Sequence, residues 1–377
     1  MTRKLVLSAN AAWNIANFRA GLIRGLQAAG WEVVAMAPRD AHVARVEALG
    51  CRFVELPMHN TGTHPGRDLQ LLWRYRRLLA VERPDAFLGF TIKPNIYGSL
   101  AARSLGIAVV NNIGGLGTAF LRRGWLTVVA RRLYRAALAH SHCVLFQNAE
   151  DLRYFVGSGL VDARRTGRVP GSGVDLDAFS PAALPASDTV RFLMIARLLR
   201  DKGVAEFADA AQRIRARGLN AEFALLGFAD DEGGRAVTRT ELDAWQADGR
   251  LRYLGSTDDV RPHIEAAHCV VLPSYREGVP RTLLEAGAMA RPLIATDVPG
   301  CRDAVDDGIN GFLARPRDGA DLAAQCERFI ALPPAARLAM GAASRAKIEA
   351  EFDEREVVKT YLSVLDGLRA SRAKRAA

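Results

Sequence analysis

The sequence lacks the features that mark secreted, zinc-binding and membrane-spanning chains. Its five cysteines are scattered without a C-x-x-C pair, which argues against a disulfide framework and against a zinc site. No stretch reaches the roughly 18 uninterrupted apolar residues that a membrane-spanning helix needs. The apolar run over residues 5–7 is short, and Asn10 and Asn14 follow it at once, so we predict a buried strand there and not a signal peptide. These absences predict a reduced, cytoplasmic protein.

The sequence also lacks an excess of acidic residues, and its basic excess is confined to one half. The 377 residues carry 51 Lys+Arg against 41 Asp+Glu, a net charge of +10. Residues 1–185 hold 23 basic and 12 acidic residues (+11), whereas residues 186–377 hold 28 and 29 (−1). Such a field favours an anionic partner for the N-terminal half: a phospholipid surface, a lipid pyrophosphate, a nucleic acid or an acidic sugar. The alternative explanation is an arginine-rich codon bias that only keeps the protein soluble. Such a bias would raise the charge of both halves, but only one half is basic.

Short apolar runs typical of strands alternate with amphipathic stretches typical of helices. This alternation predicts βαβ units and parallel sheets covered on both faces. A segment rich in Pro, Gly and Ser over residues 169–185 interrupts it and is the best linker candidate. We expect strands over residues 4–8, 32–36, 84–90, 107–111, 191–195, 222–226, 251–254, 269–272 and 292–295, and helices over 15–29, 67–82, 202–217, 319–331, 334–351 and 354–371.

The pattern predicts an α/β protein of two Rossmann-like domains whose parallel sheets face each other across a cleft. We expect an N-terminal domain over residues 1–178 and a C-terminal domain over residues 179–353. The helix expected over residues 354–377 would return toward the N-terminal domain. In open parallel sheets, ligands bind beyond the carboxyl ends of the strands, so the motifs at those ends carry the functional argument.

Residues 272–286 form the most informative stretch. It leaves a strand, turns through Gly278 and enters a helix at Pro280, a residue suited to the first helical position. The backbone N–H groups at the start of this helix would form an anion site suited to a diphosphate. Glu277 and Glu285 can bind sugar and ribose hydroxyls, because a carboxylate accepts two hydroxyl protons at once. The alternative is that Glu277 caps the helix and Glu285 lies on the surface.

Two cations follow the first strand of the second half. Arg197 and Lys202 lie at the carboxyl end of this strand, ahead of the next helix. There they can neutralise a diphosphate and the charge that develops on it as a leaving group. The alternative is an ordinary surface loop. Gly227 ends the next strand and permits a close backbone approach.

The order of these motifs resembles the retaining nucleotide-sugar glycosyltransferases of family 4, which have the GT-B fold. The spacing Glu277-x7-Glu285 is similar to the signature of that family. The similarity covers nearly the whole chain and is strongest across residues 191–315. The further residues that carry it are, in chain order, Gly171-x-Gly173-Val174-Asp175, Phe179-x-Pro181, Arg197, Lys202-Gly203, Gly227, Gly255, Pro273-Ser274, Gly278-x-Pro280, Leu284, Ala286, Thr296-Asp297-x-x-Gly300 and Asp307-Gly308-x-x-Gly311.

The resemblance implies a role for each matching residue. Arg197 and Lys202 would bind the donor diphosphate, Glu285 the ribose and Glu277 the transferred sugar. The C-terminal domain would hold the nucleotide-sugar, and the basic N-terminal domain would hold the acceptor. The family also implies retention of configuration and no obligatory metal or other cofactor. The backbone that would bind the donor belongs to Gly227, Gly278, Val279 and Pro280.

Two places depart from the family pattern. Where many members have a Gly-Gly pair after the first strand, this sequence has Trp13-Asn14; Asn14 can still hydrogen-bond the donor, although its bulk narrows the site. Where many members have a histidine after the fifth strand, this sequence has Asn112, which cannot act as a base and is assigned to the acceptor. The neighbouring run 114–117 (GGLG) is similar to bacterial enzymes that extend polyprenyl-diphosphate-linked glycans.

Two basic stretches that also contain aromatic residues suit contact with an anionic leaflet. Basic and aromatic side chains together are typical of an interfacial helix. The alternative is that the apolar face packs on the sheet and the arginines are only solvated. The first stretch contains Arg122, Arg123, Trp125, Arg131, Arg132 and Arg135, and the second contains Arg67, Arg74, Arg76 and Arg77 around Trp73 and Tyr75.

We therefore expect a glycosyltransferase that moves a hexose or N-acetylhexosamine from a UDP-sugar to a polyprenyl-diphosphate-linked glycan, docked on the inner face of the cell membrane. A donor phosphate oxygen that accepts the acceptor's proton would make a general base unnecessary. Two alternatives stay open: a UDP-sugar epimerase of the same broad fold, and a non-catalytic nucleotide-sugar or lipid-binding module. Nucleic-acid binding rests on charge alone, since no helix-turn-helix, zinc or RNA-stacking signature is present. No metal site is expected, because Asp175-Leu-Asp177 lies in the linker.

Overall fold

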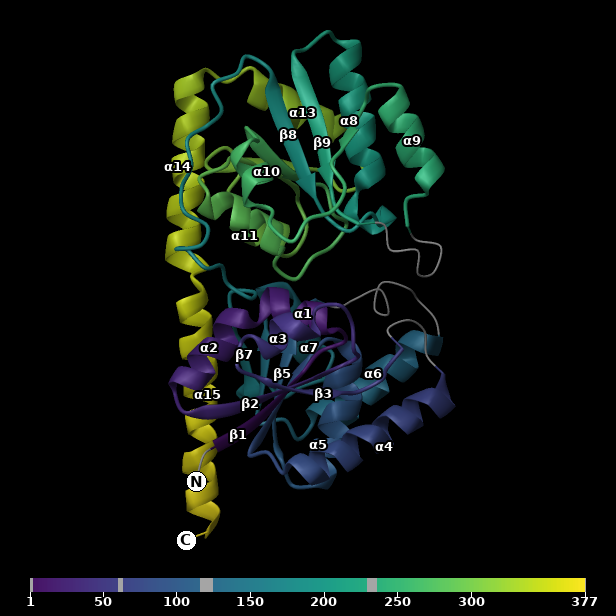
Figure 1. The fold of residues 1–377 in the computed structure, drawn as a ribbon, viewed down its shortest axis with the longest axis vertical. Helices are drawn as coiled ribbons and strands as arrows, with labels where there is room; N and C mark the ends of the chain where they lie inside the picture. The colour runs from purple at the N-terminus through teal and green to yellow at the C-terminus, as the bar shows by residue number, and fades with distance from the viewer. Residues whose placement is uncertain (1–2, 60–63, 116–124, 229–235, 377) are drawn as a thin grey trace. The chain divides into compact units, whose positions relative to one another are not determined.

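The computed structural model describes residues 3–59, 64–115, 125–228 and 236–376. The chain forms two compact units (Figure 1). The first comprises Met1–Ser172 together with Glu354–Ala377, and the second comprises Gly173–Asp353. Each unit is built on one parallel β-sheet with helices on both faces, so the predicted α/β class is confirmed.

The first unit contains a seven-stranded sheet in the order β3-β2-β1-β4-β5-β6-β7. The chain therefore reverses its direction of winding between β1 and β4, which are hydrogen-bonded neighbours. Their register pairs Ser8 with Gly89, so the two strands end side by side. The strands are β1 (Arg3–Ser8), β2 (Trp31–Ala37), β3 (Arg52–Glu55), β4 (Ala86–Phe90), β5 (Ala108–Ile113), β6 (Cys143–Phe146) and β7 (Thr166–Arg168).

Helices cover this sheet in two layers, each with its own buried core. One core packs α1, α2, α3 and α15 on one face, and the other packs α4, α5, α6 and α7 on the opposite face (Figure 1). The helices are α1 (Ala12–Phe18), α2 (Ala20–Ala28), α3 (Val43–Glu47), α4 (Pro65–Glu82), α5 (Ser99–Ser104), α6 (Trp125–Leu138), α7 (Ala149–Gly157) and α15 (Glu354–Ala376), with a π-helical turn η1 (Pro94–Gly98) before α5.

One expected helix is divided in two. The helix predicted over residues 15–29 is interrupted at Arg19, whose backbone leaves the helical region with φ −126° and ψ 3°. The Arg19 side chain is buried, and its guanidinium carbon lies 4.1 Å from the centre of the Phe90 ring. The interruption therefore coincides with a buried cation–π contact to the sheet, which hydrophobic periodicity does not reveal.

The second unit contains a six-stranded sheet in the order β10-β9-β8-β11-β12-β13. Its winding reverses between β8 and β11. One core packs α8, α9 and α13 on one face, and another packs α10, α11, α12 and α14 on the other. The elements are β8 (Val190–Ile195), α8 (Val204–Ala216), β9 (Ala221–Leu226), α9 (Arg239–Ala247), β10 (Arg252–Tyr253), α10 (Arg261–Glu265), β11 (Cys269–Leu272), α11 (Arg281–Ala288), β12 (Leu293–Thr296), α12 (Cys301–Ala304), β13 (Gly311–Ala314), α13 (Gly319–Ile330) and α14 (Pro334–Glu351).

The C-terminal helix α15 is a close-packed part of the first unit. Gly21 and Gly25, one turn apart on α2, leave room for the side chains of Glu354 and Val358, which a Cβ at either glycine would strike. Within the described residues, none of the helices combines the length and the apolar composition that crossing a bilayer requires.

Candidate functional site

Two loops meet where the winding of the second sheet reverses. One follows β8 and carries Lys202, and the other follows β11 and carries Glu277. The Nζ atom of Lys202 lies 2.5 Å from Oε1 of Glu277, and both side chains are largely buried, at 20% and 13% exposure. This ion pair joins the two loops at the position where open parallel sheets bind ligands.

A second donor fixes the Glu277 carboxylate. The Ser274 hydroxyl donates a 2.7 Å hydrogen bond to the same Oε1 atom that Lys202 contacts. Oε2 receives no hydrogen bond from any described residue. Glu277 therefore does not cap the following helix, and that alternative is excluded. The sequence reasoning placed Ser274 in the family motif without a role; its spacing of three residues from Glu277 was the available signal.

Two glycines with positive φ let these loops approach each other closely. Gly203, with φ +78°, leaves the 3₁₀ turn after β8, and a Cβ there would strike the carbonyl of Pro273. Gly227, with φ +153°, ends β9, and a Cβ there would strike the carbonyl of Ala196. The close approach expected at Gly227 is therefore an approach to the protein's own backbone, which aligns the loops after β8 and β9.

The helix that follows Glu277 begins one residue later than expected. Pro280 is the N-cap, with φ −76° and ψ 114°, and α11 starts at Arg281. The Pro280 carbonyl accepts the N–H of Leu283 at 3.0 Å, so its ring precedes the helix instead of occupying the first helical position. Val279 packs its side chain into the core, so only its backbone is left to contact a ligand. The Thr282 hydroxyl ties the first turn to the end of β8 through the Ile195 carbonyl, at 3.1 Å.

Glu285 lies one turn further along α11 and is largely buried. Its side chain is 14% exposed, so the alternative of an ordinary surface residue is excluded. Burial raises the pKa of Glu285, while Nε of Arg281, 2.7 Å from Oε1, acts in the opposite direction. A buried carboxylate with one cationic partner on its own helix is a strong acceptor for ligand hydroxyls.

The loop after β8 carries further contacts that hold its shape. Arg197 is exposed at the start of this loop, and its carbonyl accepts the N–H of Leu199 at 2.7 Å. The Tyr275 hydroxyl donates to Oε1 of Glu206 at 2.6 Å, and the Tyr275 N–H donates to the Asp201 carbonyl at 2.9 Å. Burial and the Glu206 carboxylate raise the pKa of Tyr275 to about 12. Tyr275 is thus a neutral brace between the two loops, and the sequence reasoning missed it.

The two asparagines assigned to ligands in the first unit have different surroundings. Asn112 is 2% exposed. Its Nδ2 donates to the Tyr361 hydroxyl at 2.9 Å, and its Oδ1 accepts from Gln147 at 3.2 Å. Both ends of this amide are used inside the unit, which speaks against contact with an acceptor. Asn14 on α1 differs, because its Oδ1 is buried and has no hydrogen-bond partner among the described residues.

Only part of the predicted interfacial stretch can be described. Arg122 and Arg123 lie outside the described residues, and so does the side chain of Trp125, the first residue of α6. Arg131 is half-buried and Arg132 is exposed.

The next residues of α6 pack within the unit. Tyr134 packs edge-on against Phe155 at 5.6 Å. The Arg135 guanidinium donates to the carbonyls of Gly159 and Ser158, at 2.9 Å and 3.3 Å, and so holds the end of α7. Arg135 therefore has a structural task, which sequence patterning does not reveal.

Acidic and sulfur-bearing groups offer little support for metal chemistry. Among the described residues, no group of three or more His, Cys, Asp and Glu side chains has the arrangement that could hold a metal ion. In the Asp175-Leu-Asp177 segment, Oδ1 of Asp175 accepts the N–H groups of Asp177 and Ala178 at 3.1 Å and 2.9 Å. This carboxylate shapes a turn.

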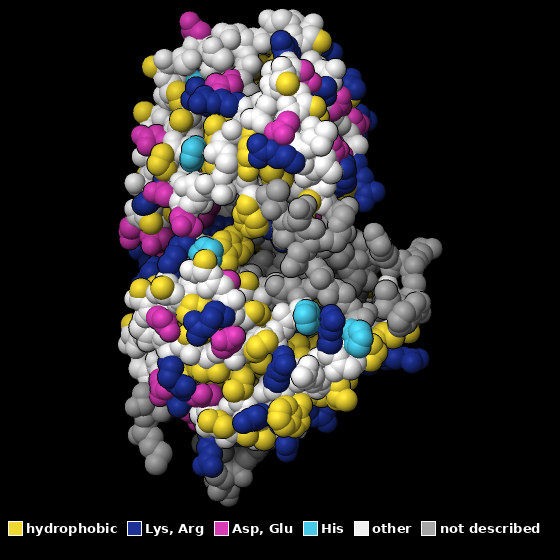
Figure 2. Space-filling model, turned by 45° about the vertical axis from the view of Figure 1, so that its right-hand side comes forward, with side chains coloured by type: hydrophobic (Ala, Val, Ile, Leu, Met, Phe, Trp, Pro, Cys, Tyr) yellow, Lys and Arg dark blue, Asp and Glu magenta, His cyan; other side chains and the backbone are white. Residues whose placement is uncertain are grey.

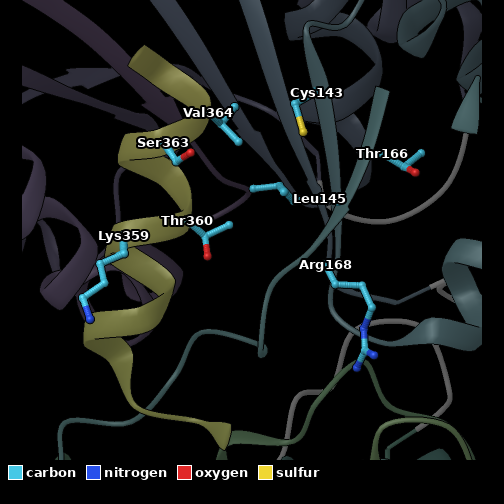
Figure 3. Close-up of a pocket in the computed structure, with 9 residues that line it drawn as sticks. Cys143, Leu145, Thr166, Arg168, Lys359, Thr360, Ser363 and Val364 are labelled. Carbon is cyan, nitrogen blue, oxygen red and sulfur yellow. The ribbon is translucent and has the colours of Figure 1, made fainter. Parts of the chain in front are cut away.

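A groove of about 430 Å³ lies in the first unit, between the β6–β7 edge and α15 (Figure 3). Figure 3 shows Thr360, Ser363 and Val364 of α15 facing Leu145 of β6 across it. Burial raises the pKa of the lining thiol of Cys143 to about 11, which makes it a poor nucleophile. This thiol is therefore not a reactive group comparable to Lys202 and Glu277 of the second unit.

Comparisons with known proteins relate both units to one family. A family model described as "Glycosyl transferases group 1" matches residues 189–331, and one described as "Glycosyl transferase 4-like domain" matches residues 15–171. The N,N'-diacetylbacillosaminyl-diphospho-undecaprenol alpha-1,3-N-acetylgalactosaminyltransferase of Campylobacter jejuni is 25% identical over 95% of this chain and 96% of its own length. The UDP-Gal:alpha-D-GlcNAc-diphosphoundecaprenol alpha-1,3-galactosyltransferase of Escherichia coli is 26% identical over 67% and 68%.

A solved structure extends the likeness to the fold. HepE of Anabaena, crystallised in complex with UDP-glucose, is 17% identical and has a TM-score of 0.80 over 97% of this chain and 99% of that one. At that identity the likeness concerns the fold alone.

Proposed function

The chain belongs to the group 1 glycosyltransferases of family 4 and has their GT-B fold, and from this premise we propose that it is a retaining enzyme that uses a UDP-sugar. In this proposal a hexose or N-acetylhexosamine is transferred to a polyprenyl-diphosphate-linked glycan, in the synthesis of a cell-surface polysaccharide or glycoprotein. The names of the two relatives support the acceptor, because both contain a sugar on diphospho-undecaprenol. The UDP-glucose held by HepE supports the donor.

The observation that carries the proposal is the Lys202–Glu277 ion pair at the carboxyl edge of the second sheet. Lys202 and Arg197 would neutralise the donor diphosphate. Glu277, fixed through one carboxylate oxygen, would accept hydroxyls of the transferred sugar with the other. Glu285 would accept the ribose hydroxyls behind the diphosphate. The backbone N–H groups at the start of α11 would complete the anion site.

A front-face reaction fits these groups and needs no general base. The acceptor hydroxyl would attack the anomeric carbon from the side on which UDP leaves, so that the new C–O bond forms as the bond to the diphosphate oxygen breaks. A phosphate oxygen of the departing UDP would take the hydroxyl proton. Lys202 and Arg197 would stabilise the negative charge that develops on the diphosphate. No metal or cofactor takes part in this proposal.

The first unit would bind the lipid-linked acceptor and contact the anionic inner leaflet of the cell membrane. Its helices α4 and α6 lie on the same face of the sheet and present exposed apolar side chains, among them Leu69 and Trp73 on α4 and Val128 on α6. The guanidinium of Arg77 lies 5.7 Å from the centre of the Trp73 ring. Figure 2 shows hydrophobic and basic side chains next to one another on this unit. Apolar contacts with basic neighbours suit a peripheral membrane surface.

One assay tests the function. The protein is incubated with a panel of UDP- and GDP-sugars, with and without a bacterial lipid extract, and nucleotide release and sugar products are followed. We expect UDP release that depends on the lipid, with the sugar recovered on the lipid. An epimerised sugar formed without lipid would overturn the proposal in favour of an epimerase. Binding of nucleotide-sugar without any turnover would favour the non-catalytic module.

A further inference from the structure

The first unit has its own reversal of winding, between β1 and β4. The paired ends of these strands place the loop after β1, which leads into α1, beside residues 91–93, which lead into η1. This topology predicts a crevice here, at the position that corresponds to Lys202 and Glu277 in the second unit. The topology that predicts a ligand site there also predicts one here.

Thr91 marks this crevice through its backbone. It follows β4 directly and has φ +64°, in the left-handed region. Among the described residues, four non-glycine residues have positive φ, and Thr91 is the one with a β-branched side chain, for which this conformation is most costly. Strained backbone persists only where the surroundings fix it, and it is concentrated at functional sites.

The structure after Thr91 supplies that constraint. The π-helical turn η1 is buried throughout. Its Asn95 donates to the Asn112 carbonyl at 2.8 Å and accepts from Nδ2 of Asn111 at 2.9 Å. The N–H of Asn95 also bonds to the Thr91 carbonyl at 3.1 Å. The Asn95 network therefore holds Thr91 in place, and π-helical turns are themselves frequent at functional sites.

Thr91, directly after β4, and Asn14, on α1, each carry a buried polar atom that lacks a partner. Neither Oγ1 of Thr91 nor Oδ1 of Asn14 has a hydrogen-bond partner among the described residues. The Thr91 hydroxyl can donate, whereas the Asn14 oxygen can only accept. A sugar hydroxyl matches either atom, because it can accept from the first and donate to the second.

One charged group beside this crevice is already paired. Nζ of Lys93 lies 2.9 Å from Oδ1 of Asp68, and both side chains are largely buried, at 15% and 8% exposure. This cation therefore has a counter-ion within the protein. Arg19 is a second cation here, buried with its guanidinium carbon 4.1 Å from the centre of the Phe90 ring. The atoms left on Thr91 and Asn14 are neutral and match a sugar hydroxyl.

We propose that Thr91 and Asn14 bind a hydroxyl of a sugar substrate in the crevice between β1 and β4. This inference rests on the proposed glycosyl transfer and names two residues that set its specificity. The strain at Thr91 is the cost of holding its hydroxyl toward the sugar. The chemistry is the same for the transferred sugar and for the acceptor sugar, and the experiment separates them.

The test compares Thr91→Val and Asn14→Leu, which remove the polar atoms at nearly constant volume, with Thr91→Ser, which keeps the hydroxyl. We expect the first two to lower kcat/KM by about 10- to 100-fold and Thr91→Ser to stay within about threefold of wild type. Thr91→Gly relieves the strain, so its Tm should rise while its activity falls. A merely structural role would lower Tm and activity together.

The readouts identify which sugar is bound. A raised KM for the UDP-sugar, with slower hydrolysis of the UDP-sugar in the absence of acceptor, assigns the hydroxyl to the transferred sugar. A raised KM for the lipid-linked acceptor, with unchanged hydrolysis of the UDP-sugar, assigns it to the acceptor. Wild-type activity in both Thr91→Val and Asn14→Leu would overturn the inference, as would losses that follow Tm alone.

If the wild-type protein shows no turnover, the proposed function is refuted. Sugar binding then tests the inference about Thr91 and Asn14 separately. Saturation-transfer NMR with a panel of free monosaccharides is the probe. Binding that is lost in Thr91→Val and kept in Thr91→Ser supports the inference. No binding to the wild type, or equal binding to both variants, overturns it.

Discussion

The two sheets reverse their winding at corresponding places, but the side chains there have opposite character. In the second unit Lys202 and Glu277 form an ion pair between the two loops, and Arg281 and Glu285 form another on α11. In the first unit the unpartnered atoms at the corresponding place are a hydroxyl and an amide oxygen, on Thr91 and Asn14, and Lys93 is paired with Asp68. The same topology thus provides an ion pair suited to a diphosphate in one unit and unpartnered neutral atoms suited to hydroxyl groups in the other.

The backbone conformations of the loops in the two units also differ. The loops of the second unit reach positive φ through glycines, which adopt it without strain, as at Gly203 and Gly227. The first unit reaches it at Thr91 through a β-branched residue. A strained backbone remains where the side chain is needed, whereas glycine suffices where only the approach of the chain matters.

The largest expected effect comes from the Lys202–Glu277 ion pair. Glu277→Gln should lower kcat about 10²- to 10³-fold, because it weakens a fixed interaction with the transferred sugar and removes the counter-charge of Lys202. Steady-state UDP release measures this loss. The matched control is Glu349→Gln, which removes the charge of an exposed carboxylate that pairs with Arg345 in the same unit and should leave kcat unchanged. Equal rates in wild type and Glu277→Gln would remove the main difference between the two units.

The next effect concerns Glu285 and pH. Glu285→Ala should lower kcat/KM about 100-fold while the fold survives, because the carboxylate accepts two ribose hydroxyls at once. In the wild type, burial raises the pKa of Glu285, so donor binding should weaken as pH falls through this raised value.

As pH falls, the stability of the fold should change in the direction opposite to donor binding, because Glu285 is titrated. Because the folded protein holds the proton more tightly than the unfolded chain, the Glu285 contribution to stability should increase as pH falls between the folded and unfolded pKa values. Glu285→Gln should abolish both pH effects, as measured by donor KM and by Tm between pH 4.5 and 8. Unchanged profiles in Glu285→Gln would assign the titration to another group.

Binding to anionic membranes should depend on the surface of the first unit around α6. The double variant Arg131→Glu/Arg132→Glu should lower binding to anionic vesicles by about thirtyfold, since each basic residue near such a surface contributes about 1 kcal/mol. Arg135 is left intact because it holds the end of α7. The control is Arg24→Glu/Arg45→Glu, an equal charge change on the opposite face of the same sheet. Equal loss in both variants would show a general charge effect and refute the role of α6.

The smallest expected effect belongs to Arg197. Arg197→Ala should lower kcat/KM about tenfold, and so remove most of the activity, because this exposed cation acts on the diphosphate through solvent-screened attraction. The loss should shrink as salt is raised, which UDP release at several ionic strengths measures. Wild-type turnover in Arg197→Ala would leave Lys202 as the cation at the diphosphate.

The sequence predicts much of the second unit and less of the first. The run of motifs from Arg197 to Gly311 places the loops after β8 and β11, and the strand expected over residues 269–272 is β11 itself. Short strands such as β3, β7 and β13, of three or four residues each, lack a periodicity long enough to recognise.

Contacts between distant residues could not be predicted from local patterns. The spacing of Glu277 and Glu285 indicates a site, but it does not show that Ser274 fixes one of the two carboxylates. Asn112 is expected after the fifth strand, where ligands bind, but it lies within β5, and its partner Tyr361 lies 249 residues away. The positive φ of Thr91 likewise depends on the packing of η1. Threonine rarely adopts positive φ, so the residue type alone predicts a negative value there.

The burial of α15 in the first unit has a consequence for synthesis on the ribosome. Val357, Tyr361, Leu365 and Leu368 complete the core that begins with the first strand. The first unit therefore cannot close until α15 has left the exit tunnel, whereas the second unit is continuous in sequence and can fold earlier. In a nascent chain the second unit should acquire protease resistance first, although the ribosome makes it second.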